Sequence, residues 1–117
     1  MELIETEQGG VAAVQVTGRI DSTTAASLQA RLTDLVHSGC TGLIVDFEQV
    51  AYISSAGFRA LLIAAKAGES RHCTLTLCGI AGEVRRTFEM GALDQVFTIL
   101  GTREECAERL MAGPKAA

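Results

Sequence analysis

Short apolar runs alternate along this chain with longer segments in which apolar residues recur every three or four positions. The short runs contain β-branched residues and are typical of strands, whereas the longer spacing is typical of amphipathic helices. The pattern predicts strands that begin near Leu3 and that span 11–16, 43–47, 74–78 and 96–100. The third run is almost unbroken, which is expected of a strand that is covered on both faces.

Four helices are predicted in the remaining segments, at about 21–39, 54–68, 81–90 and 102–111. Asp21, Ser22 or Thr23 can cap the first helix, and Thr102-Arg-Glu-Glu105 forms a capping box at the start of the last. The predicted buried stripes are Leu28, Leu32, Leu35 and Val36; Phe58, Leu61, Leu62 and Ala65; Val84 and Phe88; and Cys106, Leu110 and Met111.

The predicted order of elements is β-β-α-β-α-β-α-β-α, with a hairpin at Gly9-Gly10. Strands that alternate with helices indicate an α/β fold with a mainly parallel sheet and right-handed crossovers. The leading hairpin makes the sheet mixed. We therefore expect a single domain over 1–112, with about five strands and four helices, followed by a disordered tail at 113–117.

Composition narrows the classes of function. Apolar residues make up 48% of the 117 residues, enough for a core that needs no metal, disulfide or cofactor. There is no apolar run of membrane-spanning length and no signal-peptide pattern, so a cytoplasmic protein is the simplest interpretation. The net charge is −4 without a basic cluster, which argues against nucleic-acid binding. The cysteines (Cys40, Cys73, Cys78 and Cys106) lack zinc-site spacing and are expected to be reduced, buried thiols.

The candidate chemistry lies at Ser54 and Ser55, where the predicted second helix begins. A serine there commonly caps the helix by accepting a hydrogen bond from a free backbone N–H. The same position also favours a phosphate, because the helix dipole is positive at that end. The residues alone leave both interpretations open.

An enzyme is a further alternative, because Ser55-Ala-Gly57 between a strand and a helix is similar to the nucleophile elbow of α/β hydrolases. That motif requires a glycine where this chain has Ile53, and only His72 follows the serine in sequence. Most of a catalytic triad is missing, so we expect no catalysis.

The segment from Val45 to Leu62, VDFEQVAYISSAGFRALL, resembles the signature of the STAS domain, and within it the bacterial anti-sigma-factor antagonists. The loop at 18–21 and the passage at 78–93 are similar to the same family. This resemblance implies a binding module whose phosphoacceptor is Ser55. Its implied partners are an anti-sigma factor with serine kinase activity and a phosphatase of the PP2C type.

The resemblance also implies a partner-binding surface made of Asp21, Ser22, Thr23, Ser54, Ser55, Ala56, Gly57 and Arg59. Asp21 is interpreted equally as a helix cap or as a functional group near Ser55. Asp46 lies in an apolar run, so we expect it to be paired or to lie at the strand edge, and to hold the following loop. Many members carry aspartate where this chain has Ser54. The alternative function is a STAS subunit of a signalling scaffold or a lipid-transport complex. We expect a monomer when the protein is free.

Overall fold

The computed structural model describes residues 1–111 and confirms the predicted order of strands and helices. The sheet has the order β1-β2-β3-β4-β5, in which β1 is antiparallel to β2 and all other neighbours are parallel. Its strands are β1 Glu2–Gln8, β2 Val11–Ile20, β3 Gly42–Ile53, β4 Thr74–Cys78 and β5 Thr98–Leu100. The helices are α1 Ala25–His37, α2 Ser55–Ser70, α3 Gly82–Met90, the short 3-10 helix η1 Leu93–Gln95 and α4 Arg103–Met111. The predicted tail at 113–117 and residue 112 lie outside the described residues.

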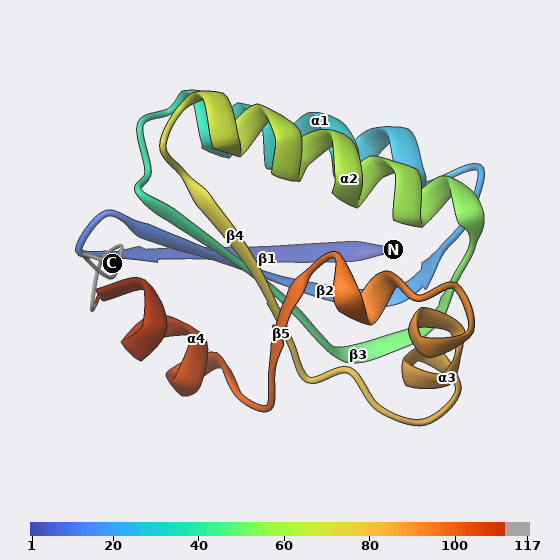
Figure 1. Ribbon diagram of the computed structural model, residues 1–117. Helices are drawn as coiled ribbons and strands as arrows, with labels where there is room; N and C mark the ends of the chain where they lie inside the picture. Colours follow the sequence, from blue (N-terminus) through green and yellow to red (C-terminus); the bar gives the residue numbers. More distant parts are fainter. Residues whose placement is uncertain (112–117) are drawn as a thin grey trace.

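Two layers of helices enclose the sheet (Figure 1). Helices α1 and α2 run side by side over one face, and α4 lies against the other. The larger core lies under α1 and α2, and α3 closes its end by placing Phe88 edge-on against three other phenylalanine rings, at centroid distances of 4.8–6.2 Å. The smaller core, which includes Ile44 and Cys106, lies under α4. Alternate residues of the central strands supply the two cores, as the pleat requires.

Strands β2 and β3 are longer than the sequence predicts. The predicted loops at 18–21 and 48–53 are largely strand, because β2 continues to Ile20 and β3 to Ile53. Their pairing contains register shifts between Gln15 and Thr17 and between Gly18 and Arg19. These irregularities interrupt the simple apolar alternation, so a sequence pattern places the strand end too early. The two long strands carry the site described below to the edge of the domain.

Several local signals are confirmed. Gly9 and Gly10 form the first turn with φ of 59° and 82°, values that glycine adopts at little cost. Gly39 follows α1 with φ of 95°. At the start of α4 the hydroxyl oxygen of Thr102 accepts a hydrogen bond from the N–H of Glu105 at 3.1 Å, and donates one to its carboxylate. The threonine cap is therefore confirmed, whereas the Glu105 carboxylate reaches back to the hydroxyl of Thr102 and so completes only part of the predicted capping box.

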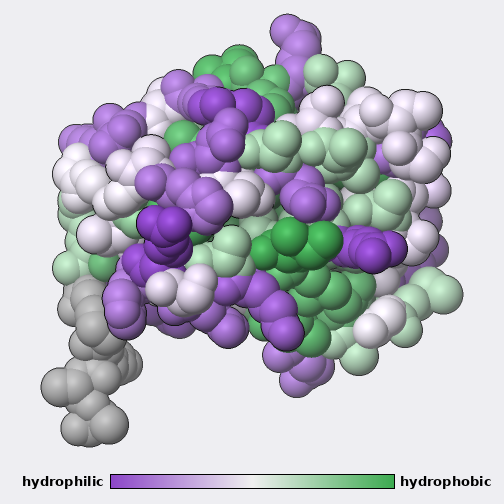
Figure 2. All heavy atoms as spheres, turned by 90° about the horizontal axis from the view of Figure 1, so that it is seen from above, coloured by the Kyte–Doolittle hydropathy of each residue, from purple (hydrophilic) through white to green (hydrophobic). Residues whose placement is uncertain are grey.

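Other local predictions are wrong. Gly68 does not end α2, which continues to Ser70, and residue 96 precedes rather than begins β5. Leu62 is 36% exposed and Met111 is 63% exposed, although both were expected in buried stripes. Leu62 faces outward together with Ile63 because the other sides of α2 already pack on α1 and the sheet. Figure 2, seen from the side of α1 and α2, shows hydrophobic atoms at the surface among hydrophilic ones.

Candidate functional site

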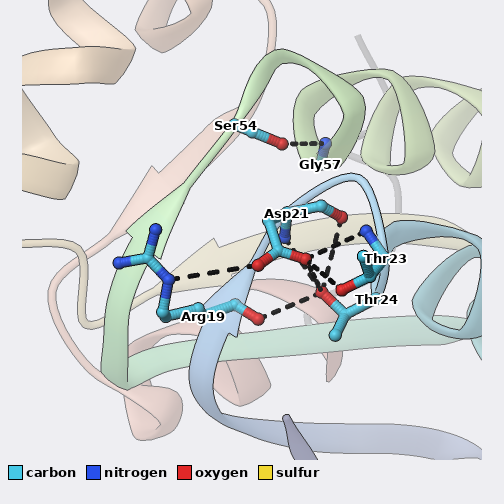
Figure 3. Close-up of polar contacts among 6 residues, drawn as sticks. All are labelled: Arg19, Asp21, Thr23, Thr24, Ser54 and Gly57. Carbon is cyan, nitrogen blue, oxygen red and sulfur yellow. Dashed lines mark hydrogen bonds and ion pairs between the residues drawn. The ribbon is translucent and has the colours of Figure 1, made fainter.

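The candidate site forms where β2 and β3 end beside one another. Ile20 pairs with Ile53, and the N–H of Ser54 donates a hydrogen bond to the carbonyl oxygen of Ile20 at 2.8 Å. Beyond these residues the chain enters the turn at 21–24 in one case and α2 in the other. The parallel pairing thus brings together two segments that are far apart in sequence, as Figure 3 shows.

The two serines have different structural roles. Ser54 is the N-cap of α2 in an extended conformation, and its hydroxyl oxygen accepts a hydrogen bond from the N–H of Gly57 at 3.4 Å (Figure 3). Ser55 is the first residue of α2 and its side chain is exposed. Capping therefore belongs to Ser54, which leaves the hydroxyl of Ser55 open to solvent at the positive end of the helix.

Gly57 fixes the position of the first turn of α2. A Cβ at this residue would lie 2.7 Å from Cγ2 of Ile20 and 2.7 Å from Cγ1 of Ile53. Only glycine lets the helix approach the two strand ends so closely. Gly57 was expected on the partner-binding surface, but it is buried, so that assignment is corrected. Its role is to let the first turn of α2, which carries the neighbouring serines, pack against the strand ends.

Asp21 organises the turn that follows β2. Its Oδ1 accepts hydrogen bonds from the N–H of Thr23 at 3.0 Å and from the hydroxyl of Thr23 at 2.7 Å. These bonds lower the pKa of the Asp21 carboxyl below its usual range, and the bond from the Thr23 hydroxyl has the largest effect. Thr24 closes the turn by accepting a hydrogen bond from the N–H of Asp21 and donating one to the carbonyl oxygen of Arg19. The turn thus holds a negative charge at the edge of the site.

The expectation that Asp21, Ser22 or Thr23 caps α1 is wrong. The N-cap is Thr24, and its side chain makes no capping hydrogen bond. The hydroxyl of Thr24 is directed into the turn instead, where it bonds to the backbone of Asp21 and Arg19. Asp21 contributes through its backbone instead, since its carbonyl oxygen accepts hydrogen bonds from the N–H groups of Thr24 and Ala25.

The structure adds Tyr52 and its contact with Arg19; Arg19 lies in the loop at 18–24 that was expected at the partner-binding surface, but it was not singled out. The two residues are register partners on β2 and β3, and the Arg19 guanidinium lies 4.2 Å from the centroid of the Tyr52 ring. Nε of Arg19 also lies 3.9 Å from Oδ2 of Asp21. Arg19 is two residues before Asp21, and Tyr52 two before Ser54. The pairing of Arg19 with Tyr52 would have been expected had the two strands been predicted long enough.

The other predicted site residues fall into two groups. Ser22, Thr23 and Arg59 are exposed and Ala56 is half-buried, so they remain available at the surface. Asp46 lies elsewhere: its carboxylate accepts hydrogen bonds from the N–H of Glu48 at 2.9 Å and from Arg103 of α4 at 3.1 Å. The expectation that Asp46 is paired and holds the following segment is confirmed.

Within residues 1–111 no group of histidine, cysteine and acidic side chains is arranged to hold a metal ion. None of the helices in that range is both long and apolar enough to cross a bilayer. The arrangement offers instead an exposed hydroxyl at a helix start, beside a carboxylate and a guanidinium–aromatic pair. Such a surface can accept a phosphoryl group and contact another protein.

Comparisons with known proteins agree with this geometry. BtrV of Bordetella bronchiseptica, named as an anti-sigma factor antagonist, is 31% identical over 92% of this chain and 92% of its own length. The anti-sigma-F factor antagonist RsfB of Mycobacterium tuberculosis is 27% identical over 92% of this chain and 87% of its own. The crystal structure of an anti-sigma factor antagonist from Mycobacterium paratuberculosis superposes with a TM-score of 0.85 at 21% identity, over 94% of this chain and 93% of that one. The STAS domain profile matches residues 3–106, and the chain belongs to the STAS domain family.

Proposed function

We propose that this protein is an anti-sigma-factor antagonist, a binding module switched by phosphorylation of Ser55. The observation that carries the proposal is that the two serines differ in structural role: Ser54 caps α2, whereas the hydroxyl of Ser55 is exposed. The names of BtrV and RsfB support the same role. In the unphosphorylated form the module sequesters an anti-sigma factor and so frees a sigma factor.

A phosphate on Ser55 is compatible with the fold. The first turn of α2, Ser-Ala-Gly, carries no acidic side chain that would repel it, and the helix dipole favours negative charge at this end. A phosphoserine adds about −1.5 to −2 charges at neutral pH. The surface also holds the ionised Asp21 together with Arg19 and Arg59, whose charges sum to about +1, so the phosphate would reverse its net charge to slightly negative. The switch therefore acts on docking, through repulsion and desolvation, rather than on folding.

The proposed cycle needs two enzymes that act on this protein, while the module itself performs no reaction. An anti-sigma factor with serine kinase activity would phosphorylate Ser55 and be released, and a phosphatase of the PP2C type would restore binding. The contact surface would comprise Asp21, Ser22, Thr23, Ser54, Ser55, Ala56 and Arg59, with Arg19 and Tyr52 beside it. The cycle would operate in the cytoplasm, with the free module as a monomer.

The test measures affinity for an anti-sigma factor captured from the native bacterium with the tagged wild-type protein. Calorimetric titration compares the wild type with Ser55→Asp and Ser55→Ala. We expect Ser55→Asp to bind at least about tenfold more weakly, which corresponds to about 1.4 kcal/mol of repulsion and desolvation. Ser55→Ala keeps wild-type affinity, because it adds no charge.

Ser70→Asp is the matched control, since Ser70 is an exposed serine at the opposite end of the same helix. It changes the net charge equally but lies far from the site, so its affinity should match the wild type. Equal affinity of Ser55→Asp and the wild type would refute the switch. Phosphopeptide mass spectrometry after incubation with the captured kinase and ATP must also assign the phosphate to Ser55.

A further inference from the structure

The four cysteines form two pairs on opposite sides of the sheet. Cys40 and Cys73 belong to the core under α1 and α2, whereas Cys78 and Cys106 belong to the core under α4. All four are free and buried, as the sequence predicts. Neither pair takes part in the surface around Ser55.

Cys40 and Cys73 lie in equivalent connections, just before β3 and just before β4. These strands are neighbours, with Gly42 paired to Thr74. The sulfur atoms of the two cysteines are 3.3 Å apart. They are therefore in contact without a bond, and a covalent bond would require them to approach by little more than an ångström.

Hydrogen bonds hold the backbone of Cys73 and the thiol of Cys40 in place. The N–H of Cys73 donates a hydrogen bond to the carbonyl oxygen of Gly68 at 2.8 Å, in the turn that leaves α2. The thiol of Cys40 donates to the carbonyl oxygen of Leu35 at 3.0 Å. The pair is consequently preorganised, so that joining the sulfurs needs a small local movement.

We propose that Cys40 and Cys73 form a reversible intramolecular disulfide when the protein meets hydrogen peroxide. The Cys73 sulfur, as thiolate, attacks one peroxide oxygen and the O–O bond breaks, leaving a sulfenic acid and releasing water after protonation. The Cys40 sulfur then attacks the sulfenic sulfur, the S–O bond breaks and a second water leaves. In sum two thiols and one peroxide give a disulfide and two waters, and a dithiol reductant reverses the change.

Access favours this pair over the other. Cys73 borders an open groove of about 1020 Å³ beside β4 and β5, and is 3% exposed, while Cys40 is 6% exposed. Cys78 and Cys106 are 1% and 0% exposed. The acidity of the thiols favours the other pair, Cys78 and Cys106. Burial raises the pKa of Cys73 to about 12, whereas a hydrogen bond with Cys78 lowers the pKa of Cys106 to about 7. We expect access to decide, and the high pKa to make the reaction slow.

The cross-link would join two positions that are 33 residues apart in sequence. Cys40 follows the end of α1 and Cys73 follows the end of α2, so the bond would link the ends of these two helices. Closing a loop of this length restricts the unfolded chain, and the melting temperature should rise by about 10 °C. Ser55 lies at the other end of α2, so the surface that binds a partner should not change. Oxidation would thus stabilise the module without switching it.

The test incubates the purified full chain with hydrogen peroxide, unfolds it in urea with iodoacetamide to block the remaining thiols, and maps the peptides by mass spectrometry without reduction. We expect one cross-linked peptide pair that contains Cys40 and Cys73, two alkylated thiols at Cys78 and Cys106, and a higher melting temperature that dithiothreitol restores to its original value.

Cys73→Ala and Cys78→Ala are the matched variants, since each removes one buried thiol from one pair. The first should lose the cross-link and the thermal shift, and the second should keep both. A cross-link between Cys78 and Cys106, a disulfide between two chains, or oxidation of single thiols would overturn the proposal. Because the peptide map is made on the wild type, its outcome does not depend on the folding of either variant.

Discussion

Alanine substitutions at Ser54 and Ser55 should separate capping from signalling. Ser54→Ala removes the hydroxyl that accepts a hydrogen bond from the N–H of Gly57. Loss of a serine cap costs about 0.5–2 kcal/mol. The bond measures 3.4 Å, which is long for an N–H to oxygen contact, so the lower part of that range applies. We expect Ser54→Ala to destabilise the domain by about 0.5–1 kcal/mol.

Ser55→Ala should leave stability within about 0.5 kcal/mol of the wild type, since the residue is exposed and alanine favours helices. Urea unfolding gives the two free energies. In a thermal scan the Ser54 variant should melt about 2–4 °C below the wild type. The same proteins, incubated with the kinase, should show the reverse pattern: Ser54→Ala is phosphorylated and Ser55→Ala is not.

An equal loss of stability in both variants would refute the assignment of the cap to Ser54 alone. Phosphate found on Ser54 in the wild type would refute the assignment of the acceptor. The double substitution is a further check: if the serines act independently, its destabilisation should equal that of Ser54→Ala.

Three further changes test packing and charge. Gly68→Ala should destabilise the domain by about 1–3 kcal/mol in urea, although alanine favours helices, because its Cβ meets the backbone carbonyl oxygen of Cys73; an unchanged midpoint contradicts this. Arg103→Ala should cost about 1–3 kcal/mol by leaving the buried carboxylate of Asp46 without its guanidinium partner, and adding Asp46→Asn should recover part of that loss. A hydrogen bond from an arginine of α1 lowers the pKa of Glu5, so this pair stabilises the fold above the ordinary pKa of 4.5 and the effect fades as the pH falls. Glu5→Gln should therefore be less stable than the wild type at pH 7, and the two should converge as the pH falls through the lowered pKa of the folded Glu5 carboxyl; parallel curves of stability against pH would count against the pair.

The order of elements could be predicted from the sequence because each element carries its own signal. Glycine pairs, capping residues and the change of period between strand and helix are local features, and local features do not depend on which segments meet. The lengths of β2 and β3, in contrast, depend on which segments pair with one another. Gln49, for example, has no strand signal, and it is extended because its backbone pairs with Thr17 of β2.

That error in length had a consequence for the site. A loop after Phe47 leaves the position of Tyr52 undetermined, whereas a strand that continues to Ile53 pairs Tyr52 with Arg19. The same holds for Arg19 in the predicted loop at 18–21. Individual polar residues could thus be selected from the sequence, while the contact between Arg19 and Tyr52 depends on a register that only the assembled sheet defines.

The extended strands also explain why the exposed serine is the second of the two. Because β3 remains paired through Ile53, the N–H of Ser54 is committed to Ile20 of β2, and the chain can turn into a helix only after it. Gly57 then lets the first turn approach the strand ends without a clash. The hydroxyl of Ser54 is thereby directed at the N–H of Gly57, and Ser55 is the first residue that faces solvent. If β3 ended one residue later, Ser55 would become the cap and Ala56 the first helical residue, so the exposure of the Ser55 hydroxyl depends on where the pairing of the two strands ends.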